Sequence, residues 1–114
     1  MKKFLAIGLA SLSFFLYSYS AFAYSSPGYS CRTADQPAEI AVCDSRRLSR
    51  LDRVLNHWYQ RAQERAGYFG QVNWLRRNQV AWIRSRNACG WNRACLGSKY
   101  RQRIRILRNY TLHV

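Results

Sequence analysis

Two cysteines that flank a short turn constrain this fold more than any other feature of the sequence. Cys89 and Cys95 are separated by five residues, and Gly90 and Asn92 lie between them. Apolar residues recur at helical spacing on both sides, so the stretch 79–107 is predicted to contain two helices joined by a tight turn. Gly90 suits the left-handed position after the first helix, and Asn92 can cap the second. We therefore expect a helical hairpin with both cysteines at its turn.

The segment before this hairpin has the strongest periodicity in the chain. Its apolar residues alternate between spacings of three and four, which predicts an amphipathic helix over 46–66 with Ser45 as its N-cap. The stripe consists of Leu48, Leu51, Leu55, Trp58 and Ala62, widened by Val54 and Tyr59. Gly67 and Gly70 are expected to end the helix.

Three further helices complete the prediction. Pro37 suits the first turn of a short helix over 37–43, and the hairpin supplies helices over 71–89 and 93–109. The expected inward faces contain Val72, Leu75, Gln79, Trp82 and Arg86 in one helix, and Leu96, Tyr100, Ile104 and Leu107 in the other. The tail from Tyr110 has no clear assignment. The predicted fold class is all-α, a small disulfide-linked bundle of three main antiparallel helices plus a short N-terminal helix.

The first 23 residues have the pattern of a secretory signal peptide. Lys2 and Lys3 precede an apolar run over 4–17, and Ala21-Phe22-Ala23 forms a cleavage site. The run is shorter than an ordinary membrane span, so no span is expected after cleavage. The predicted organisation is a signal peptide over 1–23, an extended segment over 24–36 and a helical domain over 37–110. The protein is expected to be periplasmic or secreted.

The four cysteines indicate disulfides rather than a metal or redox centre. Export to an oxidising compartment favours disulfides, and four cysteines allow three pairings. Proximity in sequence favours Cys31–Cys43 and Cys89–Cys95. The eleven and five intervening residues do not match the C-x(2–4)-C spacing of zinc sites, and no C-x-x-C motif is present. We therefore expect no metal and no cofactor.

The charge is strongly positive and unevenly distributed. Loss of Lys2 and Lys3 would lower the formal net charge from +14 to +12, and no acidic residue follows Glu64. Such a surface attracts anionic partners. The candidate binding surface comprises Trp91 and Arg93 at the turn, and Arg101, Arg105 and Arg108 along the last helix.

The polar residues do not form a recognisable catalytic constellation. Five carboxylates are present, and neither His57 nor His113 is accompanied by a nucleophile or a metal-binding motif. Asp52 lies beside apolar Leu51, so we expect it to form a buried structural ion pair with Arg86 or Arg103. The protein is therefore predicted not to be an enzyme.

One set of residues, spread over about 31–107, has a characteristic order and spacing: Cys31, Ala34, Glu39, Val42, Cys43, Leu48, Leu51, Asp52, Leu55, Tyr59, Gln79, Trp82, Arg86, Cys89, Cys95, Leu96, Tyr100, Arg103, Ile104 and Leu107. Through these residues the chain resembles the LprI-type lysozyme-inhibitor N-terminal domain. Val42 stands where the family usually has Ile. The resemblance implies an all-helical, disulfide-linked, exported and non-enzymatic domain.

The resemblance also implies a partner, a lysozyme or another cell-wall hydrolase. Host lysozymes are typically cationic, so a charge of +12 would slow encounter with them. An exposed Arg could still enter the carboxylate-lined cleft of a peptidoglycan-cleaving glycosidase. The alternative partner is an anionic polymer, either lipopolysaccharide or nucleic acid, bound by the basic second half of the chain.

Overall fold

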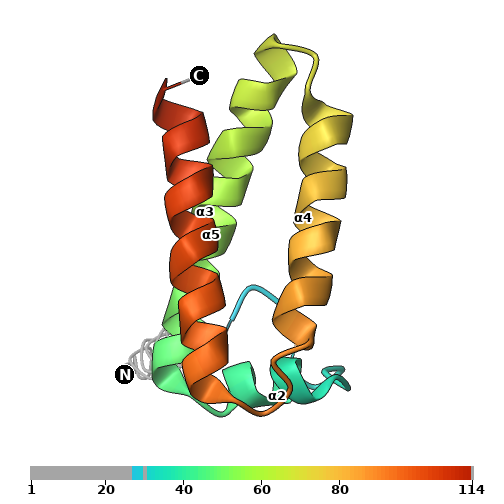
Figure 1. Cartoon of the computed structure of the whole chain (residues 1–114), viewed down its shortest axis with the longest axis vertical. Helices are drawn as coiled ribbons and strands as arrows, with labels where there is room; N and C mark the ends of the chain where they lie inside the picture. The colour runs from blue at the N-terminus through green and yellow to red at the C-terminus, as the bar shows by residue number, and fades with distance from the viewer. Residues whose placement is uncertain (1–26, 30, 114) are drawn as a thin grey trace, which may run out of the picture.

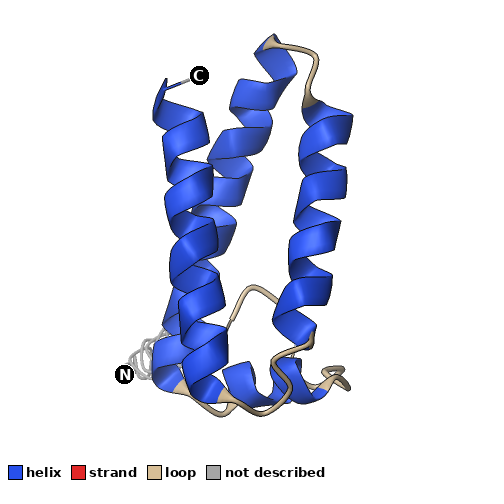
Figure 2. Ribbon diagram, viewed as in Figure 1, coloured by secondary structure: helices blue, strands red, loops and turns tan. Residues whose placement is uncertain are grey.

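A computed structural model describes residues 27–29 and 31–113. The predicted signal peptide over 1–23 lies outside these residues. The described part contains α2 (Pro37–Cys43), α3 (Arg46–Tyr68), α4 (Val72–Asn87) and α5 (Arg93–His113), and these residues form no strand (Figure 2). The all-α prediction is confirmed. None of these helices has both the length and the apolar character needed to cross a membrane.

The three long helices follow an up-down-up path (Figure 1). α4 runs antiparallel to α3, and α5 returns in the direction of α3. α3 and α5 are therefore parallel, and they share the most extensive helix–helix contact. Both begin at the same end of the bundle, where α2 also lies, whereas the loop between α3 and α4 lies at the opposite end (Figure 1).

The predicted capping residues are confirmed. Ser45 Oγ accepts a hydrogen bond from the Leu48 amide at 3.2 Å, which satisfies a free donor at the start of α3. Asn92 Oδ1 does the same for the Cys95 amide at 3.0 Å. Gly90 has φ of +57°, a left-handed conformation that glycine adopts without a Cβ clash. These local signals explain why the predicted helix starts agree closely with the structure.

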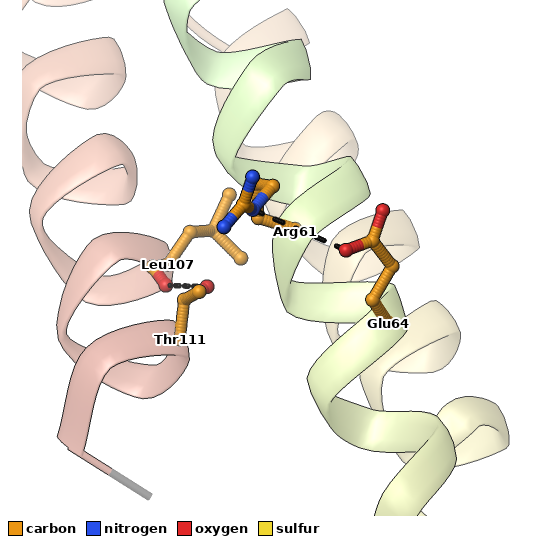
Figure 3. Close-up of polar contacts among 4 residues, drawn as sticks. All are labelled: Arg61, Glu64, Leu107 and Thr111. Carbon is orange, nitrogen blue, oxygen red and sulfur yellow. Dashed lines mark hydrogen bonds and ion pairs between the residues drawn. The ribbon is translucent and has the colours of Figure 1, made fainter.

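Three helix ends differ from the prediction. The helix predicted over 71–89 is α4, which ends at Asn87. α3 continues through Gly67 to Tyr68, and Gly70, with φ of +67°, makes the turn. α5 extends through the unassigned tail to His113. The Thr111 hydroxyl donates to the Leu107 carbonyl at 2.8 Å (Figure 3), and the Tyr110 hydroxyl donates to Gln71 before α4. One bond within α5 and one tertiary bond to Gln71 therefore hold a last turn of α5 that periodicity alone did not reveal.

The core is formed by the facing stripes of α3 and α5, closed by α2 and α4. Its buried apolar side chains are Ala38, Ala41, Val42, Leu48, Leu55, Ala62, Ala66, Leu75, Leu96, Tyr100 and Leu107. Burying each Leu contributes about 1.5–3 kcal/mol relative to leaving it exposed. Val54 lies outside this core with 38% of its surface exposed, because it occupies the edge of the α3 stripe.

Both predicted disulfides are present. Cys31–Cys43 ties the N-terminal segment to the end of α2, and Cys89–Cys95 closes the turn between α4 and α5. Each closes a short loop, with sequence separations of 12 and 6 residues. In the chain-entropy model, loops of this length stabilise the fold by roughly 2–3 kcal/mol each. The two bridges reinforce the same end of the bundle.

Candidate functional site

Asp52 is the buried polar centre of the bundle. The Tyr100 hydroxyl donates to Asp52 Oδ1 at 2.7 Å, and Arg86 Nη1 donates to that hydroxyl at 3.2 Å. Asp52, Arg86 and Tyr100 are all buried. One hydroxyl of α5 thus connects a carboxylate of α3 to a guanidinium of α4. The predicted direct pair of Asp52 with Arg86 is replaced, within the described residues, by this bridge through Tyr100.

The second oxygen of Asp52 holds the N-terminal segment. Asp52 Oδ2 accepts hydrogen bonds from the Gly28 amide at 2.6 Å and from Asn56 Nδ2 at 3.3 Å. The Tyr29 hydroxyl donates to the Glu39 carbonyl at 2.8 Å, which ties the same segment to α2. The carboxylate therefore receives three hydrogen bonds, which replace the water it loses on burial.

Arg86 is held from several sides. Its Nε and Nη2 donate to Asn87 Oδ1 at 3.2 and 2.9 Å. Its guanidinium carbon lies 5.8 Å from the centre of the Tyr29 ring and 5.7 Å from that of Trp82. Aromatic faces attract cations at these distances. The guanidinium is therefore fixed inside the bundle and is not presented to a partner.

Arg103 forms a separate polar cluster. Its Nε donates to Gln79 Oε1 at 2.9 Å and its Nη1 to Asn78 Oδ1 at 2.6 Å. Its Nη2 is buried without a hydrogen-bond partner among the described residues, and burial lowers the pKa of Arg103. Arginine remains charged despite such a shift. Arg103 thus links α5 to α4 through amides and does not pair with Asp52.

Both tyrosines near Asp52 are held in the protonated form. Burial raises the pKa of Tyr100 well above its ordinary 10.0, and the negative charge of Asp52 raises it further. Burial and Asp52 have the same effect on the pKa of Tyr29. At neutral pH both hydroxyls are therefore hydrogen-bond donors rather than bases or nucleophiles.

A cavity of about 300 Å³ opens beside this network. Its polar lining includes Tyr29, Glu39, Asp52, Asn56, Gln79 and Arg86. Asp52 already accepts hydrogen bonds from three donors. The polar groups that line the cavity therefore suit a structural role, in which they join the N-terminal segment, α3, α4 and α5. Among the described residues, no group of three or more His, Cys, Asp or Glu side chains is arranged to hold a metal ion.

The residues proposed for binding lie on the outside. Trp91 is 61% exposed, and Arg93, Arg101, Arg105 and Arg108 are also exposed. The Cys89–Cys95 bridge encloses Trp91 and Arg93 in a short loop, so this turn is braced. Arg101 turns toward Arg47 of α3 beside Gly97, whereas Arg108 lies 6.0 Å from the centre of the Trp58 ring. The arginines of α5 thus have different neighbours on α3.

Arg61 and Glu64 form an exposed ion pair on α3. Figure 3 shows Arg61 and Glu64 one turn apart on α3, with Nε and Oε2 4.0 Å apart and both side chains largely exposed. An exposed pair at this separation contributes between zero and about 1 kcal/mol.

The sequence interpretation missed the bridging role of Tyr100 and the proximity of Arg47 to Arg101. A signal for the first was present, because a buried tyrosine hydroxyl requires a hydrogen-bond partner. Asp52 was a natural acceptor, yet only the packing of α3 against α5 selects it. No local signal connects Arg47 with Arg101, because they lie on different helices.

The lysozyme inhibitor LprI family matches residues 30–111, from the segment before α2 almost to the end of α5. This chain belongs to the LprI family. The match spans both disulfides, Asp52 and Tyr100, and it confirms the resemblance inferred from the sequence. No curated protein matches the chain, and no solved structure does.

Proposed function

We propose that this LprI-family protein is an exported, non-enzymatic inhibitor that binds a peptidoglycan-cleaving glycosidase. Family membership is the observation that supports this proposal. The two disulfides agree with export, because such bonds persist in oxidising compartments outside the cytoplasm. The periplasm and the extracellular medium both meet this requirement.

The turn between α4 and α5 is the proposed contact surface. It presents an exposed Trp91 beside Arg93, and the disulfide limits the entropy lost when the turn binds a partner. Trp and Arg are enriched among residues that dominate binding energy. A guanidinium can also pair with the carboxylates that line a glycosidase cleft. Exposed Tyr68 and Phe69 lie at the opposite end of the bundle, so one cleft would not contact both loops (Figure 1).

Inhibition of cell-wall lysis tests the proposal. The purified, oxidised protein at micromolar excess should slow lysis of a peptidoglycan substrate by at least one of several lysozyme types. Trp91→Ala and Arg93→Ala should each raise the inhibition constant at least about tenfold, the range of strong interface residues. Unchanged lysis with every lysozyme type would overturn the proposal.

Two variants at the opposite end serve as controls. Tyr68→Ala removes an exposed aromatic side chain, and Arg76→Ala removes the same charge as Arg93→Ala. Both should inhibit like the wild type. An equal loss in Arg76→Ala and Arg93→Ala would mean that overall charge, and not the turn, determines inhibition.

Binding of an anionic polymer through Arg101, Arg105 and Arg108 is the alternative. The family match favours the inhibitor, since its description names lysozyme inhibition. Polymer binding that neutralises several phosphates would weaken steeply with salt, which provides a direct distinction.

A further inference from the structure

A second hollow, of about 370 Å³, lies between the starts of α3 and α5. The described residues that line it are Ser45, Arg47, Leu48, Arg93, Ala94 and Arg101. Three of the six are arginines and none is acidic. Within the described part of the chain, no ion pair engages Arg47, Arg93 or Arg101. The hollow therefore gathers three positive charges with no carboxylate among the described residues that line it.

The two helices bring their arginines together over a glycine. A Cβ atom at Gly97 would lie 2.9 Å from Nη2 of Arg47 and 3.1 Å from Nη1 of Arg101. The two guanidinium groups thus converge on one point of bare α5 backbone. Two positive charges this close repel each other, and an anion bound between the guanidinium groups would be attracted to both.

The helix ends add charge of the same sign. α3 and α5 are parallel, so their positively polarised N-termini lie at the same end of the bundle (Figure 1). Neither helix has an acidic residue in its first turn, where a carboxylate would be favourable. The first turns instead carry Arg46 and Arg47 in α3 and Arg93 in α5. The helix ends and the arginines therefore both favour an anion at this position.

We propose that this hollow binds a phosphate group, with Arg47, Arg93 and Arg101 donating hydrogen bonds to its oxygens. The planar guanidinium matches the spacing of phosphate oxygens and forms charge-assisted, often bidentate, hydrogen bonds. Free phosphate and the phosphate of a lipid headgroup share this chemistry. Arg93 also belongs to the proposed lysozyme contact, but the tests of the phosphate site contain no lysozyme, so the two proposals can fail separately.

Titration with inorganic pyrophosphate, followed by NMR of backbone amides and arginine Nε–H groups at constant ionic strength, tests the site. Saturable shifts are expected at Arg47, Arg93, Gly97 and Arg101. Arg47→Gln and Arg101→Gln should each raise the dissociation constant about tenfold, a typical loss for one charge-assisted contact. The matched control, Arg76→Gln, removes the same charge from an exposed position near the start of α4, at the opposite end of the bundle, and should change the dissociation constant less than about twofold.

Gly97→Ala tests the geometry without removing charge. Alanine favours the helix, so the variant should fold, and its Cβ would displace the flexible ends of Arg47 and Arg101. Its pyrophosphate affinity should fall about as far as in the arginine variants. Unchanged affinity in Gly97→Ala, or equal losses in Arg76→Gln and Arg101→Gln, would overturn the proposal.

Vesicles identify the source of the phosphate. If the hollow binds a lipid headgroup, the wild-type protein should be retained on phosphatidylglycerol vesicles more strongly than on phosphatidylcholine vesicles. Arg101→Gln should lose this extra retention. Saturable pyrophosphate binding with equal vesicle retention in Arg101→Gln and Arg76→Gln would assign the site to soluble phosphate. The absence of both forms of binding would overturn the proposal.

Discussion

At the scale of single residues, Tyr100 explains how a charged side chain is accommodated inside a small bundle. A direct buried ion pair requires both charges to lose their water, and the attraction between them often fails to compensate for this loss. Here a neutral hydroxyl lies between Asp52 and Arg86, and hydrogen bonds to Gly28 and Asn56 complete the shell of the carboxylate. One tyrosine therefore joins three helices.

Tyr100→Phe tests this role. Loss of the hydroxyl leaves Asp52 Oδ1 and Arg86 Nη1 without their shared partner, so the free energy of unfolding should fall by about 1–3 kcal/mol in urea titrations. Tyr110→Phe is the matched control, because within the described part of the chain its half-buried hydroxyl has one hydrogen-bond partner, Gln71. The control should lose less than about 1 kcal/mol. Equal losses would contradict the special role of Tyr100.

The raised pKa values of Tyr29 and Tyr100 predict a loss of stability at alkaline pH. Both values lie above the ordinary 10.0, so the folded state keeps its protons where the unfolded chain releases them. The stabilisation is complete below pH 10 and declines as the pH rises further, by at most about 1.4 kcal/mol per pH unit for each tyrosine. Urea midpoints between about pH 9 and 11 should fall less steeply in Tyr100→Phe. If the urea midpoints of Tyr100→Phe and the wild type fall equally steeply with pH, the link between Tyr100 ionisation and stability would be wrong.

At the scale of elements, the end of α3 distinguishes two glycines that look alike in the sequence. Gly67 lies inside the helix and Gly70 in the turn, at φ of +67°. A Cβ atom at either position would meet nothing within 4 Å, so the two glycines differ only in backbone conformation. The sequence interpretation treated both as helix terminators.

Alanine substitutions at these glycines should act in opposite directions. Gly67→Ala should stabilise the protein by about 0.5–1 kcal/mol, because alanine loses less backbone entropy in a helix. Gly70→Ala should destabilise it by about 1–2 kcal/mol, the cost of a left-handed conformation for a residue with a Cβ atom. Thermal unfolding followed by circular dichroism provides the measurement. The same sign for both variants would show that the helix ends elsewhere.

At the scale of the whole molecule, both disulfides and the arginine-lined hollow lie at the same end of the bundle. Both disulfides, α2 and the starts of α3 and α5 lie there, close to the Asp52 network. The opposite end is held by packing and by the bond between Tyr110 and Gln71. We infer that the bridged end provides the rigid surface on which binding residues are displayed.

Removal of the disulfides tests whether they make the bridged end rigid. Replacing Cys89 and Cys95 with Ser, or Cys31 and Cys43 with Ser, should each lower the free energy of unfolding by about 2–3 kcal/mol. The Cys31/Cys43 variant should also speed amide hydrogen exchange at Gly28, because the bridge holds the segment that bonds to Asp52. Unchanged exchange at Gly28 would show that the Asp52 contact holds this segment unaided.

Much of the fold could be predicted because its signals are local. The Leu48–Leu55 periodicity, the caps at Ser45 and Asn92, and Gly90 each act within a few residues, so each can be recognised without knowledge of the fold. The candidate site was less predictable. Asp52 was correctly expected to be buried, but its partner was not identified, because several polar residues had suitable positions on the other helices.

The sequence by itself determined where the helices start, two of their caps and the family, and it favoured the pairing of neighbouring cysteines, because these depend on short spacings along the chain. Only the tertiary structure decided that α3 and α5 run in parallel with their N-termini together. That arrangement places Tyr100 against Asp52 and brings Arg47, Arg93 and Arg101 around one hollow. The physical reason is that burial of two apolar stripes sets the register of the helices, and polar side chains far apart in sequence meet as a consequence.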